Sequence, residues 1–186
     1  PACGGVSSSS VAFTSTTAQT FTPKAGATFP AITQNGTGGT TVGAVVLNAG
    51  NLNLTSGSFN LGANALTHTF SSIAGSATLN FGTSHINITG NADLSTATIT
   101  AASANTLNFT GGSPQTYTPN AATTTLNLTQ NGAGGTTVST YNFTTPILTV
   151  AAGTLNLGTS RTHIVATTLS LTGGGLDFSN STLRVA

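Results

Sequence analysis

The side chains able to perform acid–base chemistry are few in this chain. Its carboxylates are Asp93 and Asp177, and it contains no Glu. Hydrolysis by a general acid and a general base needs two carboxyl groups a few ångströms apart. Asp93 ends a Gly-Asn-Ala-Asp stretch typical of a turn, and Asp177 stands between Leu176 and Phe178 in an alternating pattern typical of a strand. We therefore expect both carboxylates to be structural and the protein to be non-enzymatic, with no catalytic residue.

Metal-binding and nucleophilic residues are equally sparse. His68, His85 and His163 form no His-x-His or His-to-Cys spacing that would collect a metal ion, and they share no phase of the repeat described below. We expect them at the surface or in turns. Cys3 is the only cysteine, which excludes an internal disulfide. The sequence predicts no metal site and no cofactor.

Charged residues are nearly absent, and this limits the classes of partner that the protein can bind. Charged residues make up 3% of the chain, against about 25% in an average domain, so Thr, Ser, Asn and Gly must form the surface. Nucleic-acid binding is excluded because Lys24, Arg161 and Arg184 are too dispersed to form a basic patch. We expect no membrane span, because no apolar stretch approaches the roughly 20 residues that one requires.

An internal duplication dominates the sequence. Residues 19–23, Gln-Thr-Phe-Thr-Pro, match residues 115–119, Gln-Thr-Tyr-Thr-Pro, at an offset of 115 − 19 = 96. The same offset relates residues 33–36 to 129–132, and 57–62 to 153–158. We therefore divide the chain into a flexible N-terminal leader over residues 1–10, a first unit over 11–100 and a second over 101–186, with the two units in one continuous repeat architecture.

A shorter phrase recurs inside each unit, in which a polar residue stands between two apolar ones. Such alternation is typical of β-strands that bury one face, and no window shows a helical stripe. The fold class predicted is all-β, as a parallel β-solenoid, with two β-sandwich units as the alternative. In a solenoid the repeated polar residues would stack into side-chain ladders. The ladder candidates are Asn53, Asn60, Asn80, Asn87, Asn108, Asn127, Asn156 and Asp177.

The spacing of these phrases predicts four or five irregular coils per unit. Nine coils stacked at about 4.8 Å would make a rod roughly 40 Å long.

Several phrases resemble the β-strand repeats of bacterial surface proteins, adhesins and autotransporter-type passenger segments. They are residues 57–62, 136–138 and 148–158, and the resemblance extends over most of residues 19–186. It implies a β-solenoid stalk, an extracellular or cell-surface location and no active site. Cell-surface or carbohydrate surfaces are further partners that we consider for such a protein.

Two other functions compete with a structural one. Thr-x-Thr pairs at residues 20–22, 67–69, 96–98 and 116–118 are similar to the threonine arrays of ice-binding solenoids, although the pairs are scattered rather than regular. A carbohydrate-active solenoid enzyme is the third candidate, and it lacks the grouped carboxylates that its reaction needs. We rank the structural function first and ice binding second.

Self-association is expected from the phase of the duplication. Residues 11–14 already align with 107–110, and Ala186 corresponds to Thr89, so a second molecule at the C-terminal end could continue the repeat after a short gap. Solenoids normally block their ends with atypical capping coils, and neither terminus shows one. The sequence thus predicts a homo-polymer in which copies join head to tail.

Overall fold

The structure, a computed structural model, describes residues 10–186 and is all-β, with no helix in that range. Of the predicted leader only Ser10 is described, and it begins the first strand; the rest, with Cys3, lies outside the described residues. All strand pairs are parallel and form a fifteen-stranded and a five-stranded sheet. The predicted parallel β-solenoid is confirmed, and the β-sandwich alternative is wrong because sandwiches are built from antiparallel sheets.

The strands stack into three columns, which we call faces A, B and C in the order in which the chain first reaches them. Some strands bend from one face to the next, so each half belongs to a different column. Face A stacks β1 (Ser10–Phe13), the second halves of β3 (Thr28–Gln34), β5 (Asn48–Leu54) and β7 (Thr67–Gly75), then β10 (Ala92–Asp93), β13 (Gln115–Thr118), β15 (Thr136–Val138), β17 (Thr154–Asn156) and β19 (Gly175–Asp177).

The other two faces are built in the same way. Face B stacks β2 (Gln19–Phe21), β4 (Thr40–Val42), β6 (Ser58–Asn60), β8 (Thr78–Asn80) and β11 (Thr98–Thr100), and resumes with the first halves of β16 (Thr144–Val150) and β18 (Thr162–Leu171) and with β20 (Thr182–Val185). Face C stacks the first halves of β3, β5 and β7, then β9 (His85–Ile88), β12 (Thr106–Phe109), β14 (Asn127–Gln130) and the second halves of β16 and β18.

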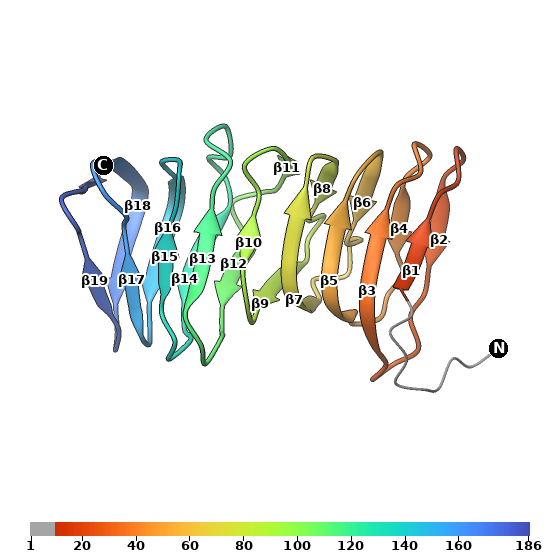
Figure 1. Cartoon of the computed structure of the whole chain (residues 1–186), viewed down its shortest axis with the longest axis horizontal. Helices are drawn as coiled ribbons and strands as arrows, with labels where there is room; N and C mark the ends of the chain where they lie inside the picture. The colour runs from red at the N-terminus through yellow and green to blue at the C-terminus, as the bar shows by residue number, and fades with distance from the viewer. Residues whose placement is uncertain (1–9) are drawn as a thin grey trace.

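The molecule is a rod of about eight turns, rather than the nine coils expected from the phrase spacing. Figure 1 shows the strands stacked along its long axis, from β1 at the N-terminal end to β19 at the other. Nine strands on face A make eight steps, so β19 lies about 38 Å from β1 at about 4.8 Å per step.

The interior of the rod is filled by the apolar members of the alternating phrases. In β9, Ile86 and Ile88 are fully buried while Asn87 between them points outward, as period-two alternation requires. Phe59, Phe70 and Phe81 are also fully buried. Each turn therefore contributes side chains to one continuous core, and no turn could bury its apolar residues alone.

The duplicated unit does not span a whole number of turns. Each step between stacked strands on one face is one turn, and four such steps on face A lead from β1 through β3, β5 and β7 to β10. The chain then passes through β11 on face B and reaches β12 on face C, which adds two-thirds of a turn. Because β12 is the copy of β1, the repeat spans four and two-thirds turns. The second unit is therefore rotated by one face: β13, the copy of β2, lies on face A instead of face B.

Glycines stand where adjacent turns approach closely at a corner. Gly57 has a φ of +74°, and a Cβ atom there would overlap the carbonyl oxygen of Gly36 in the preceding turn. Gly153, its copy, faces the Gly132 carbonyl in the same way. This contact between turns explains why both units carry glycine at this position.

Gly57→Ala is expected to lower the free energy of unfolding by about 2–4 kcal/mol, because the positive φ and the overlap both oppose a side chain. Gly26→Ala is the matched control: its φ is +75°, but no atom lies within 4 Å of the added Cβ. That variant should lose only about 1 kcal/mol. Urea denaturation of both proteins measures the difference, and equal losses would show that the close approach has no cost.

The two ends of the rod differ in how they close. At the N-terminal end Phe13, Phe21 and Phe29 pack together, with ring centroids 5.2 Å apart for the first pair and 5.4 Å for the second. At the C-terminal end Leu171, Phe178 and Val185 remain 54%, 46% and 53% exposed. The last described turn thus leaves apolar side chains in contact with solvent.

Candidate functional site

Both carboxylates lie on face A but far from each other. Asp93 is in β10 and Asp177 in β19, four steps apart along the stack, which corresponds to about 19 Å. The carboxyl pairs of glycoside hydrolases are about 5–10 Å apart. These two residues therefore do not form such a pair.

Local hydrogen bonds occupy each carboxylate. Asp93 Oδ1 accepts from Ser95 N at 3.1 Å and from Ser95 Oγ at 2.6 Å. Asp177 Oδ1 accepts from Ser179 N and Oγ, both at 3.1 Å, and its Oδ2 accepts from Asn156 Nδ2 at 2.6 Å. Each aspartate thus stabilises the turn that follows its strand by hydrogen bonds to the serine two residues later.

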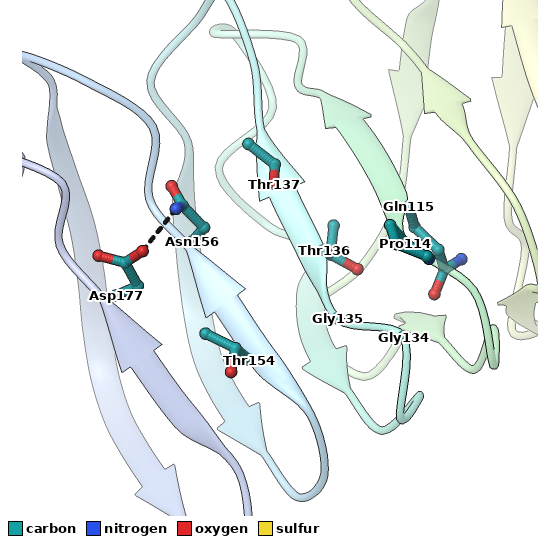
Figure 2. Close-up of a pocket in the computed structure, with 9 residues that line it drawn as sticks. All are labelled: Pro114, Gln115, Gly134, Gly135, Thr136, Thr137, Thr154, Asn156 and Asp177. Atoms are coloured by element: carbon teal, nitrogen blue, oxygen red, sulfur yellow. Dashed lines mark hydrogen bonds between the residues drawn. The ribbon is translucent and has the colours of Figure 1, made fainter.

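A shallow, open groove crosses face A over β13, β15, β17 and β19 (Figure 2). It is lined by Pro114, Gln115, Gly134, Gly135, Thr136, Thr137, Thr154, Asn156 and Asp177. Figure 2 shows the Asn156–Asp177 hydrogen bond on the β17–β19 side of the groove. The hydroxyls of Thr137 and Thr154 are exposed there and could hydrogen-bond to water or to the hydroxyls of a sugar.

Two of the predicted ladder steps are hydrogen-bonded pairs on neighbouring strands. Asn108 Nδ2 donates to Asn87 Oδ1 at 3.0 Å on face C, and Asn156 donates to Asp177 on face A. Asn60 and Asn80 also occupy adjacent rungs, on face B. Their amides bond elsewhere: Asn60 Nδ2 donates to Thr41 Oγ1 at 3.3 Å, and Asn80 Oδ1 accepts from Gly82 N at 2.9 Å.

The other two candidates stack on residues of a different type. Asn53 lies between Thr33 and Ala74 and donates to Thr33 Oγ1 at 3.4 Å. Asn127 is buried beside Thr106 and donates to the Ser103 carbonyl at 2.6 Å. The eight candidates are thus distributed over three faces, and the two hydrogen-bonded pairs belong to different ladders.

A longer polar row runs along face C, and it mixes three residue types. In register on successive strands it consists of Asn48, Thr69, Asn87, Asn108, Thr129, Thr149 and Ser170. All seven are half-buried and uncharged. We call this set the face C polar row.

The expectation that the histidines lie at the surface or in turns is wrong for two of them. His68 and His163 are fully buried and occupy corresponding places in the two units, at an offset of 163 − 68 = 95. The Nδ1 atom of His68 accepts from Leu47 N at 3.0 Å, and that of His163 accepts from Phe143 N at 3.1 Å. These rings join adjacent turns inside the rod, whereas His85 is half-buried in β9.

The environment of these two histidines favours the neutral ring. Burial lowers the pKa of both, although contact with the backbone of Leu61 or Leu157 partly offsets the effect. In His163, Nε2 donates to the Leu157 carbonyl at 2.9 Å, since Nδ1 is already the acceptor. Protonation of Nδ1 would remove its bond to the backbone.

Stability is therefore expected to fall as the pH drops below about 6.5. Because the folded-state pKa is below the unfolded value, the unfolded chain binds protons first. The stabilisation is fully present above the unfolded pKa and is lost as the pH falls towards the folded one. Melting temperatures at pH 7.5 and pH 5 test this expectation: the decrease should be smaller in His68→Gln/His163→Gln and should persist in His85→Gln. An unchanged melting temperature in the natural chain would contradict it.

No cluster of three or more His, Cys, Asp or Glu side chains able to hold a metal ion occurs in the part of the chain that the structure describes. Within residues 10–186 there is also no helix suited to crossing a membrane. Comparisons with protein-family models, with curated proteins and with solved structures found no match for this chain.

Proposed function

We propose that this protein is a non-enzymatic structural rod that acts outside the cell, in a surface fibre or an adhesin stalk, and that its copies join head to tail. The observation that carries the proposal is the exposure of Leu171, Phe178 and Val185 on one end of the rod. In the middle of the rod the inward residues, such as Phe59, Phe70 and Phe81, are fully buried. Exposed apolar surface of this kind favours contact with another surface.

The character of the side faces supports a structural function. Their outward residues are largely Thr, Ser and Asn, which bind water without charge, as in the face C polar row. The two aspartates are far apart and engaged with their own turns. The resemblance of the repeated phrases to those of bacterial surface proteins supports an extracellular location. The polar groove on face A is where a carbohydrate surface would be contacted.

Negative-stain electron microscopy and sedimentation velocity of the purified chain at neutral pH test the proposal. We expect unbranched fibres one rod wide and a sedimentation coefficient that increases with concentration. A monodisperse monomer at high concentration would refute self-assembly.

Ice binding is a second candidate, favoured by the face C polar row. The row places seven uncharged hydrogen-bonding side chains on successive strands at about 4.8 Å intervals. Thermal hysteresis in solution tests it. If ice binding occurs, Thr129→Lys on the row should abolish the hysteresis, whereas Thr41→Lys on face B should not.

A further inference from the structure

Each end of the rod presents three strands, one on each face, whose outer edges have no partner among the described residues. At the C-terminal end these are the second half of β18, β19 and β20. At the N-terminal end they are β1, β2 and the start of β3. Unpaired edges of this kind are templates for pairing with another chain.

The apolar residues of the two ends also correspond, one for each face. Leu171 ends β18, Phe178 directly follows β19, and Val185 ends β20. At the other end β1, β2 and β3 carry Phe13, Phe21 and Phe29. At the N-terminal end Phe13 is 9% exposed and Phe21 and Phe29 are half-buried, whereas the three apolar side chains at the C-terminal end are exposed.

The order in which the chain visits the three faces determines in which orientation all the edge strands of two ends can pair. Along the chain, the last strands occupy faces C, A and B, whereas the first strands occupy faces A, B and C. If a second copy stacks without rotation, face C lacks one strand at the junction. If the copy is turned by one face, its β1 lies on β18, its β2 on β19 and the start of its β3 on β20, and every edge is paired.

We propose that a second copy of this chain docks on the C-terminal end in this rotated register, with its β1 on face C. The contact rests on the head-to-tail assembly proposed above and specifies its geometry. Phe13, Phe21 and Phe29 of the second copy then cover Leu171, Phe178 and Val185.

Inside the rod, copies of β1 and β2 already occupy the two faces to which this register assigns β1 and β2 of the second copy. The strands β12 and β13 are the copies of β1 and β2, and they lie on faces C and A, where the register places β1 and β2 of the second copy. There Leu107 and Phe109 stack on Ile86 and Ile88, and all four are buried. The same segment therefore already packs on these two faces, after the same rotation by one face.

The alternatives differ in which outward residue lies beside Ala12 of the second copy. In the proposed register the face C row Asn108, Thr129, Thr149 and Ser170 continues to Ala12. Without rotation Ala12 lies beside Asp177 on face A. A third register would repeat the internal junction, where β12, the copy of β1, pairs with β9. Because β20 is the copy of β9, β1 of the second copy would then pair with β20, and Ala12 would lie beside Arg184 on face B.

Disulfide trapping in the full chain with Cys3→Ser separates these registers. Ala12→Cys is combined in turn with Ser170→Cys, Asp177→Cys and Arg184→Cys, and non-reducing gels follow oxidation. Neighbouring parallel strands about 4.8 Å apart are within the Cα range of a disulfide, about 4.4–6.8 Å. We expect the Ala12/Ser170 variant to form linked oligomers at least tenfold faster than the other two.

Sedimentation of the unoxidised variants distinguishes a wrong docking register from an absence of head-to-tail assembly. Faster linking through Asp177 or Arg184 in chains that assemble would overturn this register and leave head-to-tail assembly intact. Chains that remain monomeric and unlinked in all three variants would overturn both proposals. Ala12→Cys alone, which can form only dimers, controls for random collisions.

Discussion

If copies of the chain join head to tail as proposed, Leu171→Lys combined with Val185→Lys is expected to leave the protein monomeric at concentrations at which the unsubstituted chain assembles. Both side chains lie on the open end of the rod, 54% and 53% exposed, where a lysine is well hydrated in the monomer. A docked second copy would bury the two ammonium groups without partners, at a cost of several kcal/mol each. Sedimentation velocity should show the assembled fraction reduced at least tenfold.

Two side-face variants serve as controls for the added charge. Val46 and Ile147 are each 37% exposed, and they lie in or next to side-face strands that are paired on both edges: Val46 lies two residues before β5, between β3 and β7, and Ile147 is in β16, between β14 and β18. Val46→Lys combined with Ile147→Lys adds the same two charges, and it should assemble like the natural chain. If the end variant still forms fibres, or if the side-face variant does not, copies must associate through a side of the rod rather than its end.

Phe81→Ala is expected to reduce the free energy of unfolding by about 3–5 kcal/mol. The ring is fully buried in the middle of the rod, where the turns on either side prevent the cavity from collapsing. Tyr141→Ala removes a ring that is 45% exposed and should cost less than about 1 kcal/mol. Urea denaturation followed by circular dichroism compares the two variants, and similar losses would contradict the packing described here.

The local structure was predictable because period-two alternation is a strong signal. Leu52-Asn53-Leu54 predicts a strand with both leucines inside, and both are buried in β5 while Asn53 is exposed. The partners of each strand were harder to predict, because the turns vary in length. Ile73 pairs with Ala92 after 92 − 73 = 19 residues, but Ala92 pairs with Tyr117 after 117 − 92 = 25. An apolar–Asn–apolar triplet in the sequence therefore does not indicate which residue of the next turn pairs with it.

The buried histidines were missed because the expectation relied on residue type. A signal was present in the pattern: in Thr67-His68-Thr69-Phe70, His68 has the same parity as the inward Phe70. Likewise His163 alternates with Val165. The offset of 95 rather than 96 concealed their correspondence. Only the backbone of the neighbouring turn, which donates to Nδ1, makes these positions suitable for an imidazole.

The rotation of the second unit by one face also limits how a flat target can be bound. A phrase and its copy, such as Thr20-Phe21 in β2 and Thr116-Tyr117 in β13, are on different sides of the rod. A planar surface touching one copy cannot touch the other at the same time, so the duplication adds no avidity towards it. Only a partner that surrounds the rod, or several partners around it, could engage both copies. This duplication therefore lengthens the rod but does not double the number of contacts that one flat surface can make with it.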